Sequence, residues 1–332
     1  ALIESISVLV IDDDPTVRNL MKRQIERHGF KFLEAETGKL GIKKARELNP
    51  DVIILDILMP EFDGWSVLRS LKADKITSNI PVIMASILAK GETRILNAAM
   101  EPEIVDLTIS LNKMGAKIKG MGTKKVLIHG VEKLNKAKHN IISDRIVAGT
   151  YVIAAVMLNK TFLVKNINPE NLLKQIKILK NMGANLEIGK NYIKIKKLNK
   201  NKKINGTKII TEPFPGFPTD LQAQFMALMS ISNGISQIKE KIFENRFMHV
   251  PELNRLGAKI KVKKDIAYIK GNNKFIGAQV MASDLRASVS LVLAALCAEG
   301  ETIVNRVYHL DRGYEKIEKT LGKCGPKIIR LK

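Results

Sequence analysis

The chain has few cysteines, few aromatic residues and no long hydrophobic run. Two cysteines among 332 residues exclude a disulfide-stapled scaffold and favour a reducing, cytoplasmic compartment. The longest apolar stretch, 146–158, is too short to span a bilayer, so no membrane association is expected. Aromatic residues make up only 5% of the chain and no known nucleic-acid motif is present, which argues against a nucleic-acid partner. The first residue is not methionine, which predicts a processed chain or a piece of a longer one.

Acidic residues are scarce in only one part of the chain. Residues 1–86 hold 12 Lys+Arg and 13 Asp+Glu, whereas residues 87–332 hold 43 and 20. Such a charge step predicts a domain boundary. The basic part should attract anions such as nucleic acid, an acidic membrane surface or a phosphorylated small molecule. The alternative is that most of these lysines are solvated surface, because Lys, Ile and Asn are abundant together.

The first 86 residues alternate apolar strands with helices. Apolar segments that indicate strands lie at 6–11, 30–34, 51–55 and 81–84. Helical spacing of apolar residues follows the first and second of these, from Pro15 and at 38–48, and a third helix is expected at 65–71. Wholly apolar strands alternating with helices are typical of a doubly wound α/β fold with a parallel sheet.

Acidic side chains follow these predicted strands. Asp12 and Asp13 come after the first strand, Asp56 after the third and Ser86 after the fourth. The carboxyl ends of parallel strands meet at one sheet edge, which is where such folds bind ligands. Carboxylates gathered there repel each other unless a cation binds between them, and one of them could then attack a phosphorus centre. Strand-end acids are also common without a function.

This segment resembles response-regulator receiver domains. The resemblance lies in Val-Leu-Val-Ile-Asp-Asp-Asp at 8–14, Ile-Ile-Leu-Asp-Ile-Leu-Met-Pro at 53–60, Asp63-Gly64 and Ile-Pro-Val-Ile-Met-Ala-Ser at 80–86. It implies a flavodoxin-like sheet, Mg²⁺ held by Asp12, Asp13 and Asp56, phosphorylation of Asp56 by a histidine kinase, and Ser86 as the switch hydroxyl. The pattern stops after the fourth strand, and no Lys-Pro pair follows. The receiver is therefore predicted to be truncated.

The rest of the chain is an internal repeat. Gly115-Ala, Gly183-Ala, Gly257-Ala and the variant Gly325-Pro recur, each after an expected helix. A second mark is Ser or Thr before Asp144, Asp220 and Asp284, and the next glycine follows after 39, 37 and 41 residues. Each aspartate is expected to cap an apolar helix. The unit is about 70 residues long, too long for a thin solenoid, which predicts a small α/β layer per repeat.

Three arginines break the repeat. Arg246 and Arg312 lie near expected helix starts, and Arg286 follows the third aspartate mark. Guanidinium groups match phosphate and carboxylate geometry, so these residues are candidates for an anion clamp. The alternative is that each one pairs with a neighbouring acid at a helix end.

From about residue 89 onward the chain resembles UDP-N-acetylglucosamine 1-carboxyvinyltransferases, which are enolpyruvyl transferases of peptidoglycan synthesis. The resemblance lies in five stretches: Asn97 to Leu107, Phe217-Pro-Thr-Asp-Leu-Gln-Ala-Gln-Phe225, Phe243-Glu-Asn-Arg-Phe-Met-His-Val-Pro-Glu-Leu253, Gly277 to Ser288, and His309-Leu-Asp-Arg-Gly-Tyr-Glu315. It implies α/β units of the inside-out barrel type. The predicted domains are a partial receiver at 1–88, a remnant of the first transferase domain at 89–143 and most of the second at 144–332.

The resemblance also implies substrates and roles. The sugar 3-hydroxyl of UDP-N-acetylglucosamine would add to C2 of phosphoenolpyruvate, after which phosphate leaves, with no cofactor. Asp220 would be the base, Arg312 would bind phosphate, Arg246 and Arg286 would line the phosphoenolpyruvate site, and Ile242 would touch the sugar nucleotide through its backbone. The family's catalytic cysteine segment has no counterpart here, and Cys297 is expected in the core.

The chain therefore reads as two truncated families joined at 86–89 without a linker, which predicts a chimeric or rearranged reading frame. The main hypothesis is a transferase-like protein that is catalytically incompetent alone. The alternatives are a phosphorelay regulator phosphorylated at Asp56, a nucleic-acid binder and a non-catalytic scaffold.

Overall fold

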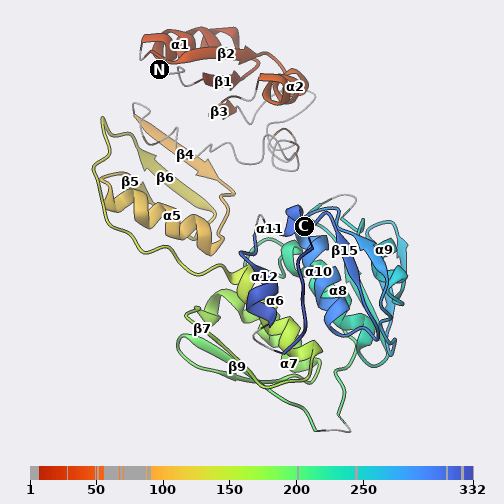
Figure 1. The fold of residues 1–332 in the computed structure, drawn as a ribbon. Helices are drawn as coiled ribbons and strands as arrows, with labels where there is room; N and C mark the ends of the chain where they lie inside the picture. Colours follow the sequence, from red (N-terminus) through yellow and green to blue (C-terminus); the bar gives the residue numbers. More distant parts are fainter. Residues whose placement is uncertain are drawn as a thin grey trace. The chain divides into compact units, whose positions relative to one another are not determined.

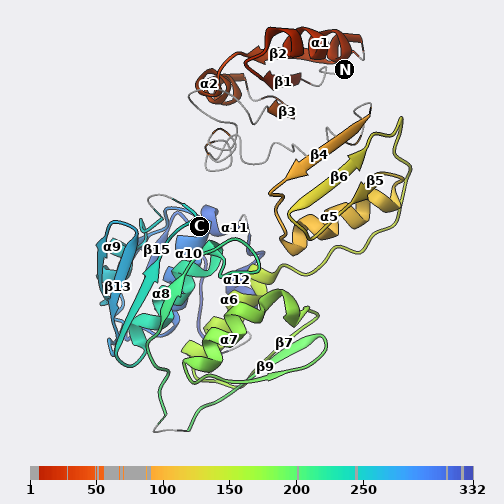
Figure 2. The same ribbon diagram turned by 180° about the vertical axis from the view of Figure 1, so that it is seen from behind.

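The computed structural model describes residues 7–27, 29–48, 50, 52–55, 67, 70, 87, 91–199, 202–243, 246–311, 313–322 and 325–331. The chain divides into two compact units (Figures 1 and 2). The first unit comprises residues 1–98 and 107–139, and the second comprises 99–106 and 140–332. In the described residues, no helix is both long and apolar enough to cross a membrane.

The first unit begins with a parallel sheet between two helices. The strands are β1 (Ser7–Ile11), β2 (Lys31–Ala35) and β3 (Val52–Leu55), in the order β2-β1-β3, and the helices are α1 (Pro15–Arg27) and α2 (Gly38–Leu48). Leu9 and Ile11 pack with Ala45 of α2, while Val8 and Val10 pack with Ile25 of α1. One helix thus covers each face, and the predicted parallel α/β sheet is confirmed. The strand expected at 81–84 lies outside the described residues.

A second, antiparallel sheet completes the first unit. It has the order β4-β6-β5, with β4 (Glu92–Leu96), β5 (Lys117–Lys119) and β6 (Lys125–His129), and α5 (Pro102–Lys113) precedes β5. Leu111 at the end of α5 packs on Ile118 and Ile128. The same order, helix then two strands, returns in the second unit.

The second unit carries three sheets around a helical core. The sheets are β7-β9-β8, β10-β11-β13-β12 and β14-β15, built from β7 (Phe162–Lys165), β8 (Asn185–Ile188), β9 (Tyr192–Lys196), β10 (Lys208–Ile210), β11 (Ile235–Lys239), β12 (Lys259–Lys263), β13 (Ile266–Lys270), β14 (Gln279–Met281) and β15 (Ile303–Asn305). The helices are α6 (Arg145–Met157), α7 (Leu173–Asn181), α8 (Gln222–Ile231), α9 (Val250–Arg255), α10 (Leu285–Leu296), α11 (Tyr308–Asp311) and α12 (Ile317–Gly322), with 3-10 turns η1 (Pro169–Leu172) and η2 (Thr219–Leu221).

Helices α6, α8 and α10 form the centre of this unit. Helix α8 contacts both α6 and α10, and Figure 1 shows the sheets on the outside. Nine of the ten residues of α8 are buried, and all of these except Gln222, Gln224 and Ser230 are apolar. This is the inside-out arrangement that the resemblance implies: apolar helices lie in the middle and lysine-rich strands face solvent.

The glycine marks of the repeat share one backbone conformation. Gly115, Gly183, Gly257 and Gly325 have φ of 102°, 102°, 99° and 111°. In the first three repeats the following alanine amide donates to the carbonyl five residues earlier, at 3.0, 2.9 and 3.0 Å. This is the glycine-terminated helix end in which a left-handed residue satisfies free carbonyls. The predicted repeat is confirmed at the level of the backbone.

Candidate functional site

Three aspartates occupy equivalent repeat positions, but they make different contacts. Asp144 caps α6 by accepting from the Ile146 and Val147 amides at 2.7 and 2.9 Å. Asp284 caps α10 in the same way, at 2.8 and 2.9 Å from the Arg286 and Ala287 amides. These two predicted caps are confirmed. The cap predicted for Asp220 is wrong: Pro218 takes the cap position of η2, with no side-chain hydrogen bond.

The carboxylate of Asp220 binds two arginines instead. Arg246 Nη2 donates to Asp220 Oδ1 at 3.0 Å, and Arg286 Nη2 donates to Oδ2 at 3.0 Å. The exposed fractions of these side chains are 38% for Asp220, 27% for Arg246 and 18% for Arg286. Two of the three predicted clamp arginines, Arg246 and Arg286, therefore lie together. The Arg286 guanidinium pairs with Asp220 and not with Asp284, so the helix-end alternative is wrong for this residue. The acidic neighbour of Arg246, Glu244, lies outside the described residues.

Each of these two arginines also interacts with groups other than the Asp220 carboxylate. Burial acts to lower the pKa of Arg286, but Asp220, together with Tyr314 and Asp144, raises the pKa overall. The Arg246 guanidinium lies 5.1 Å from the centre of the Phe243 ring. Both guanidinium groups thus present forked donors from a partly buried place, which is the arrangement that binds oxyanions.

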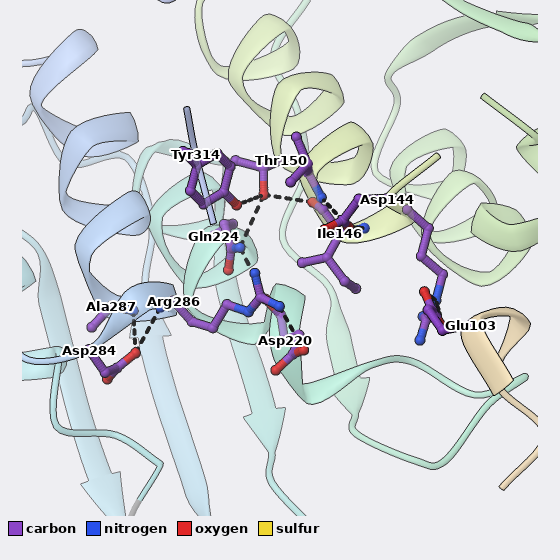
Figure 3. A network of polar contacts seen from close by, with 12 residues as sticks. Glu103, Asp144, Ile146, Thr150, Asp220, Gln224, Asp284, Arg286, Ala287 and Tyr314 are labelled. Atoms are coloured by element: carbon purple, nitrogen blue, oxygen red, sulfur yellow. Dashed lines mark hydrogen bonds and ion pairs between the residues drawn. The ribbon is translucent and has the colours of Figure 1, made fainter. Parts of the chain in front are cut away.

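A buried polar network backs the Asp220 segment (Figure 3). The Thr150 hydroxyl donates to the Ile146 carbonyl at 2.9 Å and contacts the Tyr314 hydroxyl at 2.8 Å. Gln224 Nε2 donates to Thr150 Oγ1 at 3.1 Å and to the Asp220 carbonyl at 3.0 Å. The network joins α6, α8 and the segment after α11, so it fixes the backbone that carries Asp220.

Glu240 is the main residue of this region that the sequence did not reveal. It follows β11, is 4% exposed, and accepts hydrogen bonds from the hydroxyls of Thr211 and Thr219. It also accepts from the amides of Ile242 and Phe243. A glutamate between Lys239 and Lys241 looks like a solvated charge in the sequence, and no periodicity could have shown its burial.

The other predicted site residues fall into two groups. The amide of Ile242 is already bonded to Glu240, which leaves its carbonyl for any ligand contact. Arg312, Asp56 and Ser86 lie outside the described residues. Their predicted roles stay predictions.

The expected Mg²⁺ ligands are only partly described. Asp12 and Asp13 follow β1 as predicted, but Asp12 Oδ1 already accepts from the Asp14 amide at 2.8 Å. Arg18 Nη1 donates to the carbonyls of both, at 2.8 and 3.0 Å. Among the described residues no group of three metal-ligating side chains comes together. The third expected ligand, Asp56, lies outside the described residues, so the Mg²⁺ site stays a prediction.

Cys297 is unsuited to nucleophilic chemistry. It lies at the end of α10, and burial raises the pKa of its thiol to about 11. The thiolate is the reactive form, so this thiol is a poor nucleophile near neutral pH. Cys297 is partly buried and packs against the core, rather than lying within it as expected.

Comparison with known proteins now places this site in a family. The EPSP synthase (3-phosphoshikimate 1-carboxyvinyltransferase) family model matches residues 63–321. The chain belongs to this family. A response regulator receiver domain model matches residues 8–113, so a receiver-type segment is joined to an enolpyruvyl transferase segment, as predicted. The matches overlap at 63–113, which includes the predicted junction at 86–89.

Individual relatives agree with this assignment. UDP-N-acetylglucosamine 1-carboxyvinyltransferase of Bartonella tribocorum is 53% identical over 250 residues, covering 75% of this chain and 58% of the relative. The second such enzyme of Mesorhizobium japonicum is 50% identical over 261 residues, covering 79% and 62%. A solved enolpyruvyl transferase of Streptomyces tendae aligns with a TM-score of 0.68 at 25% identity, covering 78% of this chain and 60% of that one. The chain thus spans about three fifths of the length of these relatives.

Proposed function

We propose that the family segment of this chain is the phosphoenolpyruvate-handling part of a UDP-N-acetylglucosamine 1-carboxyvinyltransferase of peptidoglycan synthesis. The main support is the convergence of Asp220, Arg246 and Arg286 from three separate segments. The 50–53% identity to relatives of that name supports the choice of sugar nucleotide. The receiver-type segment keeps a phosphorelay role through Asp56 as an alternative hypothesis.

The site chemistry follows from the two ion pairs. Phosphoenolpyruvate carries a phosphate and a carboxylate, and two guanidinium groups offer the forked donors that such oxyanions accept. In the structure Asp220 uses both of its oxygens on these same donors. An anion that binds the arginines would release Asp220, whose carboxylate could then accept the proton of the attacking sugar hydroxyl. Binding of one substrate would thereby free the base for the other.

Substitution of Arg286 by alanine is expected to weaken phosphoenolpyruvate binding about tenfold, because one charge-assisted contact to the anion is lost. Calorimetric titration of the full chain at low ionic strength measures it. Arg255→Ala is the matched control, since Arg255 is 62% exposed and 3.9 Å from Glu252. Equal effects of the two substitutions would mean that only net charge matters, and would contradict the proposal.

The 332-residue chain alone is expected to release no phosphate from phosphoenolpyruvate in the presence of UDP-N-acetylglucosamine. The resemblance places the catalytic cysteine in a family segment without a counterpart here, and the Cys297 thiol is protonated near neutral pH. A coupled phosphate assay measures this. Sustained release that disappears in Arg286→Ala would contradict the expected incompetence while supporting the proposed site.

A further inference from the structure

Glu240 is a buried carboxylate that ties three segments of the second unit together. Its Oε1 accepts from the Thr211 hydroxyl at 2.7 Å and from the Ile242 and Phe243 amides at 2.8 and 3.2 Å. Its Oε2 accepts from the Thr219 hydroxyl at 2.8 Å. All four donors are neutral, so hydrogen bonds compensate the burial of this charge.

These contacts form a closed path that includes two residues of the proposed anion site, Arg246 and Asp220. From Glu240 the path passes to the Phe243 amide and on to the aromatic side chain of Phe243. The Arg246 guanidinium lies 5.1 Å from the centre of that aromatic ring. Arg246 donates to Asp220 at 3.0 Å, and Asp220 directly follows Thr219. Thr219 returns to Glu240 through its hydroxyl. The carboxylate therefore lies where the base candidate and the loop that carries Arg246 meet.

We propose that Glu240 is a positioning residue that holds the Arg246 side chain at the anion site, beside Asp220, through hydrogen-bond geometry rather than through its charge. The inference rests on the proposed function, since it assigns Glu240 to that anion site. Glu240 touches neither of the guanidinium groups in the described contacts, and it acts through Thr219 and Phe243. Hydrogen bonds from residues that do not touch the ligand can keep the binding side chains in the narrow range of positions that a site requires.

The separate roles of the two oxygens make the idea testable. In Glu240→Gln an amide oxygen can take the place of Oε1 and keep its three donors. The amide nitrogen then faces the Thr219 hydroxyl, which can rotate and accept instead of donate. Glutamine should therefore behave like the wild type, whereas Glu240→Ala removes all four bonds.

The first test needs no ligand. Hydrogen exchange of the Ile242 and Phe243 amides is measured in the full chain by NMR or mass spectrometry. Thr219→Val is expected to speed their exchange about fivefold, although Thr219 bonds neither amide, because the carboxylate loses one anchor. Glu240→Gln should stay within about twofold of the wild type. Thr161→Val is the control, since the Thr161 hydroxyl accepts a hydrogen bond from the Lys197 amide at 3.3 Å.

Unchanged exchange at Ile242 and Phe243 in Thr219→Val would overturn the inference, as would Glu240→Gln behaving like Glu240→Ala. If Glu240→Ala does not fold, the exchange rates in Thr219→Val and Glu240→Gln still test the inference.

The second test is a double-mutant cycle on phosphoenolpyruvate binding. Glu240→Ala should weaken binding about tenfold in the wild type and less than about twofold in Arg246→Ala, because its effect passes through that arginine. Equal losses in both backgrounds would indicate a general structural role and overturn the inference. Failure of the proposed function looks different: Arg246→Ala and Arg286→Ala would leave binding unchanged, and the exchange test would still report on the Glu240 linkage.

Discussion

Replacement of Asp220 by asparagine is expected to tighten the binding of phosphoenolpyruvate and of inorganic phosphate about thirtyfold, as two partly exposed ion pairs of about 1 kcal/mol each no longer compete with the ligand. Loss of a site residue usually weakens binding. Here the carboxylate holds both arginines at 3.0 Å, so an incoming anion must displace it. Calorimetric titration of the full chain at low ionic strength measures the change.

The control separates local competition from net charge. Asp265→Asn removes the same charge from the turn between β12 and β13, where Asp265 Oδ2 lies 3.3 Å from Nζ of Lys239, the last residue of β11. It should change anion affinity less than about twofold, because exposed charges are screened over a short distance. Weaker binding in Asp220→Asn, or equal tightening in both variants, would show that Asp220 does not compete for the arginines. High salt should shrink the difference.

The repeat shows what a single sequence can and cannot predict. The glycines at 115, 183, 257 and 325 require a left-handed backbone, which is a local property, and the structure has it at all four. The caps by Asp144 and Asp284 are local as well, because the donors are two and three residues away. Asp220 stands at the same repeat position, yet its partners are 26 and 66 residues distant. Only the folded chain brings them together.

Glu240 illustrates the same limit for a buried charge. Its hydroxyl donors, Thr211 and Thr219, lie 29 and 21 residues earlier in the chain, and its own neighbours are lysines. Hydrophobic periodicity predicts burial of apolar side chains, but it carries no information on a carboxylate satisfied by distant hydroxyls. A resemblance to a family supplies the missing information only for residues that are already known to bind substrate in that family.

For the receiver-type segment, the sequence predicted the local architecture and left its chemistry open. The apolar strands, with a helix on each face, gave the parallel sheet that the structure has. The acidic edge depends on Asp56 and Ser86, which lie outside the described residues. The phosphoacceptor and switch roles therefore rest on resemblance alone.

His249 adds a pH-sensitive element beside the same site. It is 3% exposed, directly precedes α9, and its Nε2 has no hydrogen-bond partner among the described residues. Burial lowers the pKa of its imidazole to about 4; the charge of Asp284 opposes this shift and that of Arg246 adds to it. Since the pKa is depressed in the folded state, the unfolded state takes up a proton first as the pH falls.

The second unit is therefore expected to lose about 3 kcal/mol of stability through His249 as the pH falls from above 6.5 to about 4, with no further loss from this residue below that. Urea unfolding followed by exchange of α8 amides measures it, because the single tryptophan, Trp65, lies in the first unit. The loss should be absent in His249→Leu, so the difference in stability between wild type and this variant should carry it. Replacing His129, whose side chain is 43% exposed, should leave it intact. An equal pH dependence in His249→Leu would show that other groups cause it.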